Sequence, residues 1–163
     1  MKTTTLKTIL RLSLVAILAW TVGQTLVSGQ EQSGGKRASD LEGTWRVQVT
    51  VRDCQTRVPI RTILALNTYL REGSMMETRS GSFMRSPSHG TWHDTGHRNF
   101  TATFIFFRFN SDGTPAGTQK VTRNIIVEPN PDEFNAVAAI EIFDVSGNLI
   151  STGCATETAQ RFK

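Results

Sequence analysis

The sequence predicts an all-β domain, an eight-stranded antiparallel barrel with up-and-down strand order. Three observations lead to this fold class. Apolar residues recur at every second position from Glu42 onward, as in strands with one buried face. Turn-forming pairs such as Asp112-Gly113 separate the apolar runs, and no long stretch favours a helix. Closure hides the edges of such a sheet, so we expect a barrel; a two-sheet β-sandwich is the alternative.

The first expected strand is Gly43–Arg52, where alternation is cleanest. Its odd positions carry Trp45, Val47, Val49 and Val51, whereas its even positions are polar. This pattern places one face on a core and the other in water.

Seven further strands complete the set. We expect them at Thr62–Leu70, Ser74–Arg79, Gly90–Thr95, Asn99–Asn110, Thr118–Glu128, Phe134–Val145 and Leu149–Phe162. Glu72-Gly73 ends the second strand, and Thr95-Gly96 suits a tight turn between the fourth and fifth. Pro129-Asn130-Pro131-Asp132 and Ser146-Gly147-Asn148 separate the last three strands.

The first thirty residues have the pattern of a secretory signal. Leu12–Val22 is an apolar run after a basic start, too short to be a good membrane span. Small residues at Val27 and Gly29 suit cleavage after Gly29, and an uncleaved anchor is the alternative. We therefore expect a signal peptide over 1–29, a flexible leader over 30–40, and one barrel domain over 41–163.

This organisation predicts a secreted or periplasmic protein that does not span a membrane after cleavage. The signal carries three of the eighteen basic residues, so fifteen remain against fourteen acids and the mature charge is about +1. A nucleic-acid-binding domain would keep a strongly basic balance, so we expect no nucleic-acid partner.

Cys54 and Cys154 remain after signal removal and are expected to form a disulfide, because an exported protein folds in an oxidising compartment. If the two cysteines lie opposite each other on antiparallel first and last strands, Trp45 lies opposite Lys163. Arg161 is then the diagonal neighbour of Trp45.

Gly43-Thr44-Trp45 resembles the Gly-x-Trp signature that opens the first strand of calycins, the lipocalin and avidin-like barrels. The resemblance implies a closed barrel, and it implies that Arg161 packs across Trp45. A second Gly90-Thr91-Trp92 opens the fourth expected strand. The chain also resembles small secreted bacterial proteins of this build, which implies no activity.

The three histidines, His89, His93 and His97, lie four residues apart. On a strand this spacing separates them by about 13 Å, too far to share a metal ion. A turn at Thr95-Gly96 would bring only His93 and His97 together, so they are weak metal candidates. Loop and turn histidines are the preferred interpretation, and we expect no cofactor.

No catalytic residue is assigned, because the sequence lacks a nucleophile elbow, a phosphate-binding loop and a His-Glu-x-x-His motif. Glu157 falls on the inward face, opposite Val51 in the register above. It is expected to be a buried acid or the ion-pair partner of Arg161.

Phe104-Ile105-Phe106-Phe107 is apolar on both faces of its strand. Phe100, Phe104 and Phe106 share the inward face and line either a cavity or a filled core. The outward residues are expected to pack against a second copy of the chain, or to be covered by the leader or a loop.

We predict that the barrel binds a small apolar or amphipathic ligand in its interior. The interior candidates are Trp45, Val47, Val49, Phe100, Phe104, Phe106, Glu157 and Arg161. Two alternatives remain open. One is a barrel enzyme similar to allene oxide cyclases, with Glu157 as the acid to mutate first. The other is an envelope interaction or structural protein that uses its exposed Phe-rich face.

Overall fold

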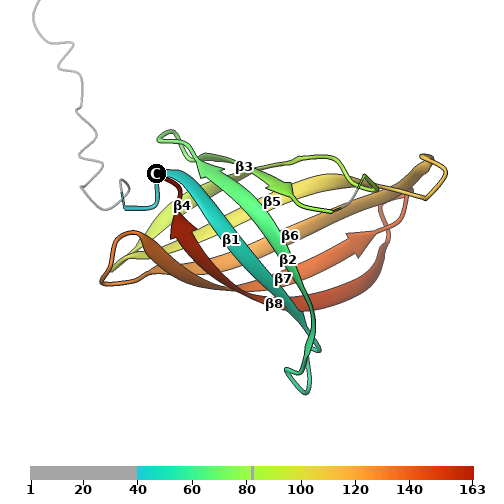
Figure 1. The fold of residues 1–163 in the computed structure, drawn as a ribbon. Coiled ribbons are helices and arrows are strands. Elements are labelled where there is room, and N and C mark those ends of the chain that lie inside the picture. The colour runs from blue at the N-terminus through green and yellow to red at the C-terminus, as the bar shows by residue number, and fades with distance from the viewer. Residues whose placement is uncertain (1–39, 82) are drawn as a thin grey trace, which may run out of the picture. The chain divides into compact units, whose positions relative to one another are not determined.

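The computed structural model describes residues 40–81 and 83–163, which form a closed antiparallel barrel of eight strands. The strands follow one another around the barrel in chain order, and the first pairs with the last (Figure 1). The predicted fold class is therefore confirmed. The expected signal peptide and nearly all of the expected leader lie outside the described residues.

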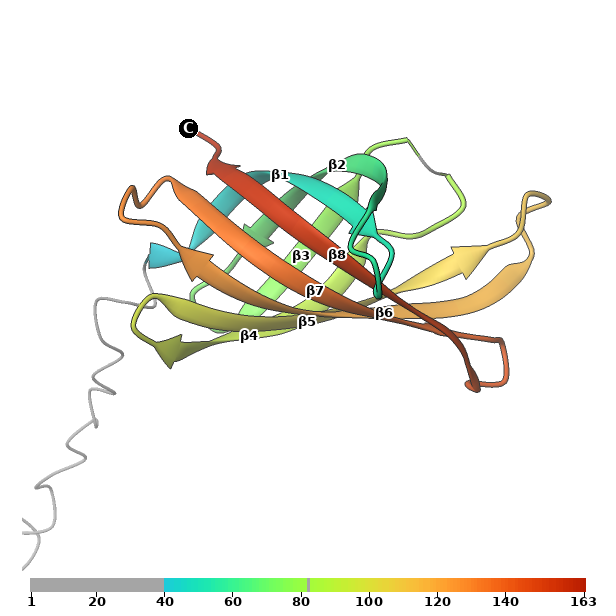
Figure 2. The same ribbon diagram turned by 90° about the horizontal axis from the view of Figure 1, so that it is seen from below.

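The expected strands are all present, with ends that differ by a few residues. They are β1 (Gly43–Arg52), β2 (Pro59–Tyr69), β3 (Ser74–Arg79), β4 (Ser88–Gly96), β5 (Asn99–Phe109), β6 (Pro115–Val127), β7 (Glu133–Phe143) and β8 (Leu149–Arg161). Figure 2 shows β8 lying beside both β1 and β7, where the barrel closes. No helix in the described part of the chain is long and apolar enough to cross a membrane.

The turn between β4 and β5 lies two residues later than we expected. His97 and Arg98 form it, with positive φ angles of 53° and 65°, and Gly96 precedes them at 95°. Gly96 pairs with Asn99 across the turn. A two-residue turn with both residues in the left-handed region matches the twist of the strands that it joins, which explains why the turn forms here.

The register of β1 against β8 differs by two residues from the expected one. Trp45 lies directly opposite Arg161, not Lys163. The residue opposite Cys154 is Arg52, the last residue of β1. Cys54 lies in the turn that follows β1, and the expected register had placed it on the strand. Because side chains alternate between the two faces of a strand, a shift of two residues leaves the same side chains facing inward.

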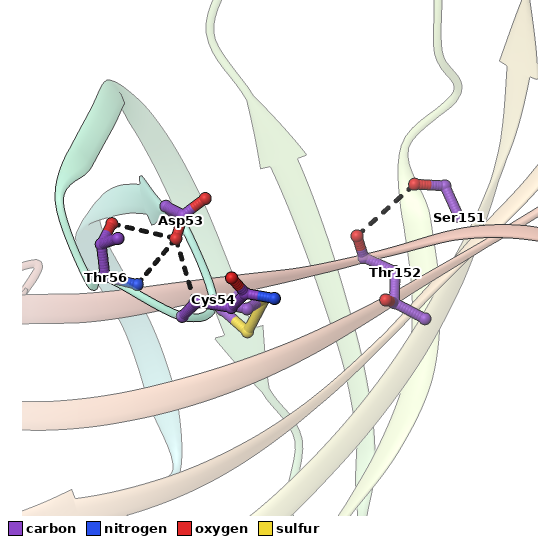
Figure 3. Close-up of a disulfide and its surroundings, with 7 residues drawn as sticks. Asp53, Cys54, Thr56, Ser151 and Thr152 are labelled. Carbon is purple, nitrogen blue, oxygen red and sulfur yellow. Dashed lines mark hydrogen bonds between the residues drawn. A yellow bond between two sulfur atoms is a disulfide. The ribbon is translucent and has the colours of Figure 1, made fainter.

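Glu157 keeps its inward position under this shift and lies opposite Val49 rather than Val51. The expected disulfide is confirmed. Cys54 and Cys154 are bonded with their Cα atoms 5.3 Å apart, and the bond joins the turn after β1 to β8 (Figure 3). Asp53 shapes this turn by accepting hydrogen bonds from the Thr56 amide (2.7 Å) and hydroxyl (2.9 Å).

Aromatic rings fill one end of the barrel, which we call the packed end. The ring centroid of Phe134 lies 4.9 Å from that of Trp45 and 6.4 Å from that of Tyr69. The ring centroid of Trp92 lies 6.1 Å from that of Tyr69 and 5.8 Å from that of Phe100. All five residues are at least 95% buried. Aromatic pairs at such distances stabilise a core beyond the area that they bury.

Arg161 covers the packed end from outside. Its guanidinium lies 4.2 Å from the Trp45 ring centroid and donates hydrogen bonds to the carbonyls of Glu42 (2.5 Å) and Asp40 (2.7 Å). Arg161 also pairs with Asp132 at 3.2 Å. The contact with Trp45 is the one that the calycin resemblance implied.

Candidate functional site

The opposite half of the barrel encloses a cavity of about 560 Å³. This volume lies within the range of small-molecule sites in proteins. Its walls combine charged and polar residues with an apolar part that includes Val49, Ile63, Phe104, Phe106, Val121 and Ile140. Small residues on β7 and β8, namely Ala138, Ala155 and Gly153, also line it. Larger side chains at these three positions would project into the same space.

A buried ionic cluster forms the inner end of this cavity; we call it the floor cluster and define it as Glu77, Arg85, Arg123 and Glu157. Arg123 Nη2 lies 3.2 Å from Glu157 Oε1 and 3.8 Å from Glu77 Oε2. The residues Arg123, Glu157 and Glu77 are only 1%, 3% and 4% exposed. Buried charges require such pairing, because burial removes their hydration.

Arg123 connects the floor cluster to the packed end. Its Nη1 donates to the hydroxyl of Tyr69 over 3.1 Å, and its guanidinium lies 4.5 Å from the Phe104 ring centroid. The residues paired with Arg123 on the neighbouring strands are Ala102 and Ala138. These small neighbours leave room for the long side chain within the barrel.

Arg85 enters the barrel from the segment between β3 and β4. It pairs with Glu77 at 3.2 Å, donates to the hydroxyl of Ser88, and lies 3.5 Å from the Phe106 ring centroid. Ser88 in turn donates to Glu77 over 3.4 Å. Glu77 is thus held by two arginines and a hydroxyl.

Two polar atoms of the floor cluster have no hydrogen-bond partner among the described residues. They are Oε2 of Glu157 and Nε of Arg123. Leaving a buried polar group unpaired costs about 1–3 kcal/mol, and more for a charged group. Glu157 and Arg123 also line the cavity, so a polar group that enters it would lie beside these two side chains.

Burial raises the pKa of Glu157, Arg123 opposes this shift, and Glu77 adds to it. Burial by itself would lower the pKa of Arg123, but Glu157, Tyr69 and Glu77 outweigh it and the pKa is raised. Arg123 therefore keeps its proton. One cation shared between two carboxylates does not fully compensate the burial of Glu157. The pKa of Tyr69 is also raised, mainly by burial.

Two arginines lie nearer the open end and also line the cavity; we call Arg61 and Arg79 the mouth arginines. The side chain of Arg52 is directed to the outer face instead, where it donates to the Thr156 hydroxyl over 2.8 Å. Within the described residues, neither Arg61 nor Arg79 has a carboxylate at ion-pair distance. Burial and the charge of Arg61 lower the pKa of Arg79, and the charge of Glu77 opposes this shift.

The structure brings four of the eight predicted interior residues to the cavity wall. These are Val49, Phe104, Phe106 and Glu157. The other four are placed elsewhere: Trp45 and Phe100 in the packed end, Val47 in the core beside it, and Arg161 over the outside of Trp45.

Of the two alternatives expected for Glu157, the structure has the buried acid, with a pKa that burial raises, and its ion-pair partner is Arg123 rather than Arg161. Positions 157 and 161 are four residues apart on β8, which separates them by about 13 Å along the strand. The sequence reasoning also missed Glu77, Arg85 and Arg123. Arg123 could have been found, because it lies two residues from both Val121 and Ile125 and therefore faces inward with them.

The histidines lie away from the cavity. His93 and His97 are exposed, and His93 pairs with Thr101 on the adjacent strand. Over residues 40–81 and 83–163, no group of three or more His, Cys, Asp or Glu side chains is arranged to hold a metal ion.

The outer face of β5 is apolar, as its sequence indicated. Phe104 and Phe106 are buried inside the barrel, whereas Ile105 is 48% and Phe107 63% exposed. The packing of this face against a second copy of the chain remains a prediction.

Comparisons of the chain with protein-family models, with curated proteins and with solved structures found no match. The fold and the site define the protein as a closed, disulfide-bonded β-barrel with an internal cavity that ends on buried charges.

Proposed function

We propose that this protein binds a small amphipathic ligand inside its barrel. The single observation that carries the proposal is the cavity of about 560 Å³, whose apolar walls end on a buried Glu157 oxygen without a partner. Apolar walls with a few convergent polar groups are typical of small-molecule sites.

The distribution of polarity in the cavity supports an amphipathic rather than a purely apolar ligand. Phe104, Val121 and Ile140 would contact the apolar part of the ligand. A polar group on the ligand would reach Glu157 and recover the hydrogen bond that Oε2 lacks. An apolar ligand would leave this oxygen unpaired, as it is in the free protein, and would gain no hydrogen bond from it.

The calycin resemblance is a second support, because Arg161 packs across Trp45 as the resemblance implied. The disulfide is compatible with an oxidising extracellular or periplasmic location. We propose that the protein acts there as an exported carrier, with function set by the shape and polarity of its cavity.

The test begins with native mass spectrometry of the protein purified from its own host, before and after denaturation. A small molecule released on denaturation would support the proposal. Binding is then measured by isothermal titration with lauryl alcohol in the wild type and two matched variants. Ala155→Phe fills the cavity, whereas Val137→Phe adds a ring on the outer face of the adjacent strand, where Val137 is 58% exposed.

We expect Ala155→Phe to lose binding and Val137→Phe to keep it. Circular dichroism will check that both variants fold, and Ala155→Leu replaces Ala155→Phe if the larger ring prevents folding. Equal binding by the cavity-filling and exposed variants, or no binding by the wild type, would contradict the proposed function.

A further inference from the structure

We propose that the cavity selects an amphipathic hydroxy acid, with the hydroxyl at the floor cluster and the acid group at the mouth arginines. This inference rests on the proposed function and deepens it by naming the chemical class of the ligand. It depends on an asymmetry of charge and hydrogen bonding between the two ends of the cavity.

The floor cluster disfavours a carboxylate. Two buried carboxylates, Glu77 and Glu157, already lie there. Arg123 is engaged with Tyr69, Glu77 and Glu157 through its terminal nitrogens. The two arginines of the floor cluster, Arg85 and Arg123, already pair with these two carboxylates. A third negative charge would therefore be buried without a further cation to compensate it.

A hydroxyl fits the floor cluster without adding charge. Oε2 of Glu157 belongs to a side chain that is only 2% exposed, and it has no partner. A hydroxyl can donate to this oxygen when the carboxylate is ionised and accept from it when it is protonated. It can also accept from Nε of Arg123, the other atom of the pair that lacks a partner.

The mouth arginines provide the opposite environment. Arg61 and Arg79 lie close enough for the charge of Arg61 to act on Arg79, yet in the described part of the chain neither has an ion-pair partner. Nε of Arg79 is buried without a hydrogen-bond partner. The carboxylate of Asp53 accepts hydrogen bonds from Gln55 and Thr56 in its own turn. An anionic group would relieve the repulsion between the two guanidiniums and form charge-assisted hydrogen bonds.

The apolar walls lie between these two polar ends and require an apolar middle in the ligand. The test compares three probes of equal chain length by isothermal titration: ω-hydroxylauric acid, lauric acid and lauryl alcohol. We expect the hydroxy acid to bind about tenfold more tightly than either single-headed probe. Added salt should reduce the affinity of the two acids more than that of the alcohol, because the mouth is partly exposed.

Glu157→Met and Arg79→Met assign the two ends of the cavity. Glu157→Met removes the carboxylate oxygen at the floor and should reduce the preference for the hydroxy acid over lauric acid, whereas Glu157→Gln should restore part of it. Arg79→Met should abolish the preference for the hydroxy acid over lauryl alcohol. Arg71→Met is the control, because it removes the same charge from a side chain that is 83% exposed and pairs with Glu42 instead.

Equal affinity for all three probes would overturn the inference alone, since the cavity would still bind ligands. The inference would also be overturned if Glu157→Met kept the hydroxyl preference, or if Arg71→Met weakened the acids as much as Arg79→Met. Failure of all three probes to bind would overturn the proposed function together with the inference.

Discussion

Arg123 and Glu157 form an ion pair inside the barrel, with Nη2 and Oε1 3.2 Å apart, although they lie on strands that are separated by β7. The pair passes over Ala138 and Ala136, the residues of β7 that lie opposite Arg123 and Glu157. Because both side chains are almost fully buried, each depends on the other for compensation of its charge.

Arg123→Met is expected to reduce the free energy of unfolding by about 3–5 kcal/mol, because it leaves Glu77 and Glu157 buried without their shared cation. The measurement is urea unfolding followed by circular dichroism. Lys120→Met is the control, because Lys120 pairs with Glu141 at 2.9 Å with both side chains more than one-third exposed. The control should lose less than about 1 kcal/mol. Equal losses in the two variants would contradict a buried, mutually dependent pair.

The pH dependence of stability should contain a contribution from Glu157, whose pKa is raised by burial. A raised folded-state pKa gives a stabilising contribution that is full below the ordinary glutamate pKa and is lost as pH rises through the folded pKa. Glu157→Gln removes it, so the variant should gain stability relative to the wild type as pH rises from about 4. The groups that interact with Glu157, namely Arg123, Glu77 and Tyr69, are present in both the wild type and the variant. The difference between the two proteins therefore reports the titration of Glu157.

The measurement for Glu157 is urea unfolding of the two proteins at a series of pH values. A stability difference that stays constant would mean that the pKa of Glu157 is not shifted, and a difference that moves in the opposite direction would mean that it is lowered; either result would contradict the prediction.

Tyr69 is the only tyrosine in the chain, so tyrosinate absorbance reports this residue alone. Its pKa is raised mainly by burial, and the charge of Arg123 opposes the shift. The folded protein should therefore ionise above the ordinary tyrosine pKa of about 10, whereas the protein in denaturant should titrate normally. Arg123→Met should raise the folded value further. Titration of the folded wild type at the denatured value would be inconsistent with a buried hydroxyl.

Replacement of both cysteines by serine is expected to reduce stability by about 4–5 kcal/mol, because the bond closes a loop with a sequence separation of 100. Urea unfolding of the double variant measures the loss. The wild type with its disulfide reduced is the matched comparison and should show a similar value. A double variant as stable as the oxidised wild type would mean that the bond adds nothing to the fold.

The outer face of β5 gives a prediction about assembly. If Ile105 and Phe107 pack against a second copy, Phe107→Gln should shift the protein toward monomer in sedimentation velocity. Thr101→Gln lies on the same face of the same strand and serves as the control. A wild type that is already monomeric would exclude this interface.

Local alternation was sufficient to predict the strands, because most inward positions are apolar and most outward positions of the clearest strand, Gly43–Arg52, are polar. The position of Cys54 relative to the end of β1 was not encoded in this pattern, so the β1–β8 register differed by two residues. The floor cluster was harder to predict, because Glu77 and Arg123 are brought together only by barrel closure. The alternation of Val121, Arg123 and Ile125 nevertheless shows that a charge faces inward.

The disulfide also has a mechanical consequence. It lies at the seam of the barrel, where β1 pairs with β8, and the segments outside the disulfide loop pair with each other along that seam. Tension applied to the two ends of the domain can peel these segments apart only as far as Cys54 and Cys154. The covalent bond then carries the load, and the chain between the cysteines is shielded from extension until the bond is reduced.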